Sequence, residues 1–138
     1  MHVLPVPAEG LPVVWDNLKG LIAEVCETSN GRFSPDTLKE AIEAKEFQLY
    51  MLFDGEEFKA IVLTQILHYR TGMKEIRVVC GVGSDYSVWA HPMERFLEAG
   101  ARQQGFGIIS ALSRPGWEKV FKPLGFTKTH VLIEKALQ

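Results

Sequence analysis

Cysteine is scarce in this sequence, which has only Cys26 and Cys80 among its 138 residues. The two do not form a Cys-x-x-Cys motif, and no histidine stands at a spacing from them that suits zinc. We therefore expect neither a disulfide framework nor a structural metal, and we assign no metal ligands.

Positive charge is not in excess either. The chain has 15 lysines and arginines against 17 aspartates and glutamates, which gives a formal net charge of -2, and its pI is about 6.1. Such a balance provides no general attraction to nucleic acid or to an anionic membrane surface. The expected partners are another protein or a small molecule such as an amine, and the sequence leaves the oligomeric state open.

Long apolar runs are missing as well, because no stretch approaches the roughly 18 apolar residues that a membrane span requires. The first ten residues lack the basic segment and apolar run of a secretory signal. Repeats, low-complexity tracts and linkers are also lacking. We expect one domain over residues 1–138, soluble and cytoplasmic.

What the sequence does contain is a clear alternation of helical and strand patterns. Residues 3–6 predict a short strand, which the nearby prolines place at an edge or an end. Ser34 and Pro35 form a cap and first-turn pair for a helix that continues to about residue 45. Between them, apolar residues spaced by three and four predict an earlier helix: Leu11, Val14, Leu18, Leu21 and Val25.

A three-stranded meander follows these helices. Residues 47–53 and 58–69 flank Asp54-Gly55, a strong hairpin signal, and residues 75–80 form the third strand. Both faces of the 58–69 segment are largely apolar. This strand is therefore expected to be central and covered on both sides.

The last third predicts a helix over residues 86–104, a strand over 106–113, a helix over 115–123 and a final strand over 127–135. Gly105 ends one helix, and Pro115-Gly116 opens the next. A Leu124-Gly125-Phe126 step then leads into the last strand.

This order of elements and its Leu-Gly-Phe step resemble the GNAT superfamily of N-acetyltransferases over nearly the whole chain. The resemblance implies an α+β fold with a mixed, mostly antiparallel sheet flanked by helices. It also implies that the fourth and fifth strands splay apart and that acetyl-CoA lies in the opening. The cofactor would then meet residues 78–85 and the region around residues 110–121.

The phosphate-binding pattern of the family is not kept. In active relatives an Arg/Gln-x-x-Gly-x-Gly/Ala motif brings backbone amides and a helix N-terminus to the pyrophosphate. The corresponding positions here are Asp85, Val88 and Ala90, and a carboxylate would repel the phosphates. The nearby Gly81-Val82-Gly83 could supply a shifted turn with free amides, or it could be a flexible connector.

The expected general acid is missing too, because the tyrosine four residues before the family's glycine corresponds to Phe121. Tyr86 could replace it, or it could be an aromatic anchor. Glu75 could act as a base through water, or it could be a solvated charge at a strand end. Cys80 is expected to be a buried thiol, and Arg77 should lie on the opposite strand face from it by parity. No catalytic triad can be assembled from the spacing.

Ser113-Arg114-Pro115-Gly116-Trp117 is the best ligand-binding candidate. Arg114 stands beside the amides of a helix start and could bind an anion, or it could form a structural salt bridge. The segment resembles a pattern in small GNAT-like proteins of tailed phages and prophages. One packed helix face is predicted for the apolar residues that follow: Trp117, Val120, Phe121 and Leu124.

Two functional classes follow. One is an N-acetyltransferase that uses acetyl-CoA and relies on positioning of an amine. The other is a GNAT-like interaction or accessory protein of a phage or prophage, in the host cytoplasm or on the virion, with a degenerate acyl-CoA site. The four departures at Asp85, Val88, Trp117 and Phe121 favour the second class, since a fold does not itself confer activity.

Overall fold

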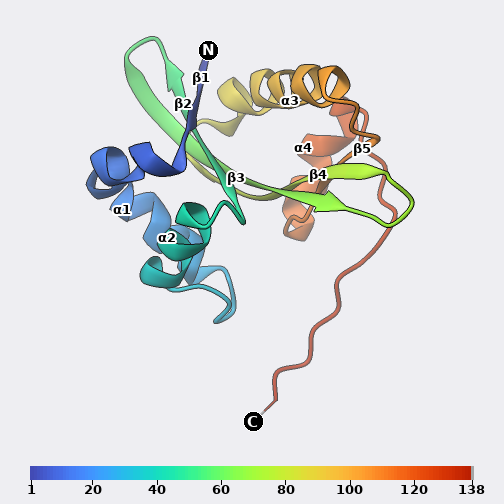
Figure 1. Cartoon of the computed structure of the whole chain (residues 1–138), viewed down its shortest axis with the longest axis horizontal. Helices are drawn as coiled ribbons and strands as arrows, with labels where there is room; N and C mark the ends of the chain where they lie inside the picture. Colours follow the sequence, from blue (N-terminus) through green and yellow to red (C-terminus); the bar gives the residue numbers. More distant parts are fainter. Residues whose placement is uncertain (138) are drawn as a thin grey trace.

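The computed structural model describes residues 1–137 and contains one five-stranded sheet in the order β1-β2-β3-β4-β5. Neighbouring strands from β1 to β4 are antiparallel, whereas β5 runs parallel to β4. The sheet is thus mixed and mostly antiparallel, as expected (Figure 1). The strand bounds are β1 (His2–Val6), β2 (Gln48–Asp54), β3 (Glu57–His68), β4 (Lys74–Gly83) and β5 (Ile108–Ala111).

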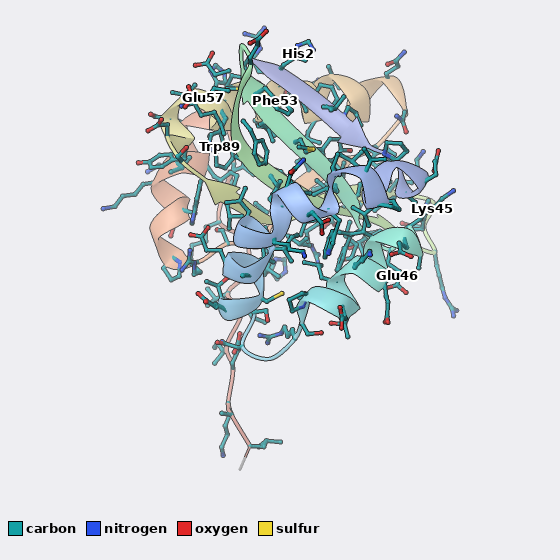
Figure 2. All side chains as sticks on the ribbon, turned by 90° about the vertical axis from the view of Figure 1, so that its left-hand side faces the viewer. His2, Lys45, Glu46, Phe53, Glu57 and Trp89 are labelled. Carbon is teal, nitrogen blue, oxygen red and sulfur yellow. The ribbon has the colours of Figure 1, made fainter. Side chains whose placement is uncertain are left out.

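Helices α1 (Leu11–Glu27) and α2 (Pro35–Glu43) cover one face of the sheet, preceded by the single turn η1 (Ala8–Gly10). Figure 2 shows both helices lying in front of the strands. The predicted cap of α2 is confirmed, because the hydroxyl of Ser34 accepts from the N–H of Thr37 while the Thr37 hydroxyl accepts from the N–H of Ser34.

Helix α3 (Tyr86–Gln103) covers the opposite face. It buries one stripe of side chains, including Trp89, Met93 and Leu97, against the sheet. Between the two layers β3 is the central strand, and residues 60–64 of it are buried on both sides. The two-sided apolar pattern of this segment therefore gave the correct prediction.

The region after β5 differs from its prediction. Residues 115–123 form three short turns rather than one helix, namely η2 (Pro115–Trp117), α4 (Glu118–Phe121) and η3 (Lys122–Leu124). Pro123 cannot donate to a helical ladder, so α4 ends before it. The predicted face of this segment still packs, because its four apolar residues are all half-buried.

The final strand predicted over residues 127–135 is wrong. Residues 127–137 are extended and exposed, and they pair with none of the five strands. The segment runs away from the sheet in Figure 1 and projects below the body in Figure 2. Alternating apolar residues give a segment the capacity for strand pairing, but a strand also needs a neighbour.

A β-bulge in β4 changes which residues share a face. Leu63 pairs with Cys80 and Thr64 with Val78, so Val79 is an extra residue. The prediction that Arg77 and Cys80 lie on opposite faces is therefore wrong, because the bulge restores them to one face. Among the helices of residues 1–137, none is both long and apolar enough to cross a membrane.

Candidate functional site

Strands β4 and β5 pair at one end and separate at the other. Their ladder joins Glu75–Val78 to Ile108–Ala111, and the N–H of Leu112 donates to the carbonyl of Val78 at 2.9 Å. Beyond this point β4 continues to Gly83 beside β3, whereas the segment that follows β5 turns away into η2. The two strands thus form a wedge in the sheet.

A cavity of about 680 Å³ occupies this wedge. It is mainly apolar and is lined by residues from both faces of the sheet, with walls from the α1–α2 loop, β4, α3 and the segment after β5. A cavity of this size is within the range of small-molecule and cofactor sites.

Four of the residues predicted to bind a cofactor lie together on this wall: Gly81, Val82, Ser113 and Arg114. Gly83 does not line it. Both interpretations of Gly81-Val82-Gly83, a shifted turn and a flexible connector, are wrong, because all three residues belong to β4 and pair with β3. The continuous antiparallel ladder keeps this segment extended.

Gly81 and Gly83 each stand where a side chain would collide with a neighbour, and the neighbour differs between them. A Cβ on Gly83 would lie 2.3 Å from the carbonyl oxygen of Lys59, so the strands could not approach as they do. A Cβ on Gly81 would meet the ring of Trp89 at 3.2 Å. The N–H of Ser84 donates to Lys59 at 3.0 Å, and because alternate amides face alternate edges, the N–H of Gly81 points away from β3.

The start of α3 lies beside the open end of the wedge. Asp85 precedes the helix in a left-handed conformation and makes no side-chain cap, so the first amides of α3 have no side-chain partner. Its carboxylate instead pairs with the ammonium of Lys59 at 3.0 Å. The negative charge expected at this position is therefore offset in part by Lys59, whose ammonium also pairs with Glu57 at 3.0 Å.

A smaller hollow of about 380 Å³ adjoins the cavity and shares Arg114 with it. Tyr86 lies here and not on the main wall. Its ring packs edge-on against Trp117, with centroids 5.4 Å apart. Trp117 continues this contact to Trp89 and Phe121, so aromatic rings fill the space between the start of α3 and α4.

Glu75 lies at the closed end of the wedge, outside the cavity wall, and is 6% exposed. Tyr69 donates to one carboxylate oxygen at 3.0 Å, and Ser110 and Arg77 donate to the other. Because Arg77 also donates to Ser110, these four side chains form one network that joins β5 to β4 and to the β3–β4 turn.

This network governs the ionisation of Glu75. Burial by itself would raise the pKa of the Glu75 carboxyl, but the hydrogen bonds from Ser110 and Tyr69 and the charge of Arg77 outweigh it, so the pKa lies below its ordinary value. The interpretation of Glu75 as a solvated strand-end charge is wrong, because the side chain is buried. A carboxylate with a lowered pKa and both oxygens occupied is a weak base.

Cys80 lines the cavity as a neutral thiol. Burial raises the pKa of Cys80 to about 11, although the charge of Arg114 acts in the opposite direction. The thiol is thus protonated at neutral pH and is not an activated nucleophile. This agrees with the sequence-based expectation of an ordinary apolar-strand cysteine.

The sequence did not single out Glu94, which lies on the cavity side of α3. Burial, and then the nearby charge of Glu98, raises the pKa of the Glu94 carboxyl. The signal that could have found it is helical spacing, because Ala90, Met93 and Leu97 line the same cavity at neighbouring positions.

A second unforeseen contact closes one side of the cavity mouth. Glu134, in the extended C-terminal segment, accepts from Asn30 at 3.0 Å and pairs with Arg32 at 3.1 Å. Both partners lie in the α1–α2 loop. Within residues 1–137, no three His, Cys, Asp or Glu side chains lie together in a way that could hold a metal ion.

No family model and no curated protein matches the sequence. Solved structures do. A probable acetyltransferase, 14% identical, has a TM-score of 0.76 over 100% of this chain and 97% of its own. Ribosomal-protein-alanine N-acetyltransferase from Brucella melitensis biovar Abortus 2308, 9% identical, has a TM-score of 0.74 over 99% and 100% of the two chains.

A third structure is a predicted acetyltransferase with acetyl-CoA from Clostridium acetobutylicum. It is 11% identical, with a TM-score of 0.67 over 98% of this chain and 95% of its own. Identities this low show the fold alone. The chain has the fold of the GNAT acetyltransferases, with its strands and helices in the order that the sequence predicted as far as α4.

Proposed function

We propose that this GNAT-fold chain binds an acyl-CoA in the wedge between β4 and β5 and transfers the acyl group to an amine. The observation that supports it is the parting of the two strands after Val78 and Ala111, which leaves an apolar cavity of about 680 Å³ through the sheet. A closed sheet would offer no such space.

The charges near the cavity suit a pyrophosphate better than the sequence alone indicates. Lys59 pairs with both Asp85 and Glu57, so it offsets part of the repulsion from Asp85. The uncapped amides of α3 and the helix dipole favour an anion. Arg114, which borders both the cavity and the adjoining hollow, adds a cation without a salt-bridge partner among the described residues.

The groups on the cavity wall determine how the protein could act on a bound thioester. An acyl-CoA supplies an acyl group already activated for attack by an amine. The N–H of Gly81 faces the wedge and can donate to a carbonyl oxygen there. The apolar side chains around it exclude water, so positioning of the amine provides much of the rate.

Proton transfer falls to Glu94 in this proposal. It is the cavity-lining carboxyl whose pKa is raised, which makes it a stronger base for the proton of the amine than an ordinary carboxylate. Glu75 remains a positioning residue that fastens β5 to β4 at the closed end. Tyr86 stays a candidate acid only if its ring leaves Trp117.

Calorimetric titration with acetyl-CoA tests the binding step. We expect saturable binding, and we expect Arg114→Ala to weaken it by about 10- to 100-fold, because a charge-assisted contact contributes roughly 1.5–3 kcal/mol. Arg70→Ala is the matched control: it removes an exposed arginine that borders neither cavity, and affinity should not change.

The transfer step is tested by release of free thiol from acetyl-CoA with a panel of primary amines. Amine-dependent release by the wild type, lowered in Arg114→Ala and not in Arg70→Ala, supports the proposal. Absence of binding at millimolar acetyl-CoA would contradict it, and binding without amine-dependent release would leave only the ligand site.

The aromatic cluster favours a second candidate. Trp117 fills the space beside the start of α3, and phenylalanine replaces the tyrosine of the family at residue 121. These features suit an accessory protein that has kept the scaffold and lost acyl transfer. A phage or prophage origin remains a prediction. A stable protein complex recovered together with absent acetyl-CoA binding would favour this candidate.

A further inference from the structure

The cavity in the wedge has two chemically different halves, one on each face of the sheet. The half that faces α3 contains the Glu94 carboxyl, and the rings of Trp89 and Trp117 pack against each other there with centroids 6.0 Å apart. The half that faces α1 and α2 is lined by side chains of the core beneath these helices, namely Val25, Phe33, Leu38, Phe47 and Leu63. The two halves therefore suit different parts of a substrate.

The polar side chains that the α1–α2 loop adds to this second half are already bonded within the protein. The hydroxyls of Thr28 and Ser29 donate to carbonyls of α1 at 3.1 and 2.8 Å, and Arg32 pairs with Glu134 at 3.1 Å. Gln65, on β3, adds an amide to the wall. A charged group placed here would lose its hydrogen bonds to water and find few partners in exchange.

The apolar wall of this half offers contact surface to an aliphatic ligand. Phe33 and Phe47 are half-buried and pack edge to face, with centroids 5.5 Å apart and an interplanar angle of 74°. Leu38 and Leu63 line the wall deeper in the core. Covering such surface with an apolar group removes both from water, which is favourable. An acetyl group has a single methyl to place against it.

We infer that the acyl group transferred by this chain is a medium-length aliphatic chain, such as octanoyl, lodged in the half of the cavity that faces α1 and α2. This inference rests on the proposed function, in which the Gly81 N–H holds the thioester carbonyl and Glu94 accepts the proton of the amine. The amine then lies on the α3 side, and the acyl chain is directed to the opposite face of the sheet.

The chemical step is the same for any acyl length. The amine nitrogen forms a bond to the thioester carbon, its proton passes to Glu94, and the C–S bond breaks so that coenzyme A leaves as the thiolate. The apolar half takes no part in these transfers. Its contribution is to hold the chain, so chain length should act mainly on binding.

Calorimetric titration with coenzyme A thioesters of increasing length tests the inference. Affinity should rise from acetyl through butanoyl and hexanoyl to octanoyl, by about fourfold for each methylene that becomes fully buried. We expect octanoyl-CoA to bind at least about 100-fold more tightly than acetyl-CoA. The heat capacity change of binding should become more negative along the series, because more apolar surface is buried.

Two valines of α1 provide a matched pair of variants. Val25 lines the cavity and is 5% exposed, so the larger ring in Val25→Phe takes space from the chain. The ratio of octanoyl-CoA to acetyl-CoA affinity should fall at least about tenfold, because two or more methylenes lose their contacts. Val13→Phe is the control and should keep the wild-type ratio, since Val13 is 82% exposed and borders neither cavity.

Phe33→Ser gives the same test without enlarging a core residue. It replaces a half-buried ring of the loop by a hydroxyl, so the affinity ratio should again fall. Circular dichroism establishes that each variant is folded before it is titrated. The chain-length series on the wild type needs no variant at all.

Each other result overturns the inference. Equal affinity for acetyl-CoA and octanoyl-CoA would exclude the acyl pocket and leave the proposed function standing, whereas absence of binding by every thioester would contradict both. A gain with chain length that survives Val25→Phe and Phe33→Ser would place the chain elsewhere. Acetyl-CoA turnover that rises with the length of an alkylamine, without a gain from octanoyl-CoA, would assign this half to the amine instead.

Discussion

The two halves of β4 perform different tasks. Its first half, Lys74–Val78, is paired on both sides and is fastened to β5 by the buried network around Glu75. Its second half, Val79–Gly83, pairs only with β3 from Cys80 onward, and residues 79–82 form a wall of the cavity. One strand thus supplies both the closure of the wedge and its opening.

The difference shows that the region richest in polar contacts need not be the region that contains the candidate site. The most elaborate set of polar contacts lies at the closed end, where it stabilises the join between strands. The open end is lined by glycine, valine and a neutral thiol. In the proposed function β4 therefore contributes backbone groups and space, whereas the charged groups come from α3 and the segment after β5, as Glu94 and Arg114.

Among the variants, Gly83→Val should have the largest effect, because it disrupts the open half of β4. The added Cβ would lie 2.3 Å from the backbone of Lys59, so the open half of β4 would separate from β3. We expect a loss of about 3 kcal/mol or more in the free energy of unfolding, measured with urea. Gly81→Ala is the control, because its Cβ meets only a side chain, at 3.2 Å. Equal stability of Gly83→Val and wild type would contradict the close approach.

Glu75→Gln should weaken the closed half. The amide keeps the shape but cannot accept from Tyr69, Ser110 and Arg77 at once, so we expect a loss of roughly 1–3 kcal/mol in the free energy of unfolding at pH 7. The exposed Glu56→Gln serves as the control. Acetyl-CoA affinity should change less than stability does, since Glu75 lies outside the cavity.

Glu75→Gln also tests how the free energy of unfolding depends on pH. The pKa of Glu75 is lower in the folded chain than in the unfolded one. The contribution of Glu75 to the free energy of unfolding is therefore fully present above the unfolded-state pKa and is lost as the pH falls through the folded-state pKa. The difference in unfolding free energy between wild type and Glu75→Gln should shrink in acid. A difference that stays constant down to pH 2 would argue against the network.

Glu94→Gln should lower the rate of acyl transfer, if the proposed function holds, by at least about tenfold. The raised pKa of Glu94 predicts that the wild-type rate increases with pH as this carboxyl loses its proton. The variant should lose that rise while binding acetyl-CoA normally. Glu98→Gln is the control: it removes the neighbouring charge, together with the ion pair of Glu98 with Arg102, and it should shift the rise to lower pH without abolishing it.

Asp85→Asn should have the smallest effect. Asp85→Asn removes a negative charge beside the start of α3 and leaves Lys59 paired with Glu57 alone, so acetyl-CoA affinity should increase about two- to threefold at low salt. Stability should change by less than about 1 kcal/mol, because Asp85 is exposed. A fall in affinity would mean that Asp85 contributes to the site instead of opposing it.

Local signals in the sequence sufficed for much of the fold. The three- and four-residue spacing after Leu11 and the Ser34-Pro35 pair predicted α1 and α2. The two-sided apolar pattern predicted that β3 is central. Each of these signals acts within a few residues, where the chain's own geometry decides the outcome.

The remaining features depend on contacts between distant residues. The bulge at Val79 and the network of Glu75 with Ser110 arise from strand register, which spacing along one strand does not reveal. The failed strand over residues 127–135 had the right pattern but no neighbour. At the site, Arg114 and Gly81 were found by local motif, whereas Glu94 needed the placement of α3.

Pro5 has a consequence for how the sheet could extend from one copy of the chain to the next. A sheet that is receptive on both sides can extend indefinitely into fibres. Here the β1 side contains Pro5, which has no N–H to donate to an added strand. Stacking of many copies edge to edge needs a receptive β1 edge on every copy, so one imino acid works against it.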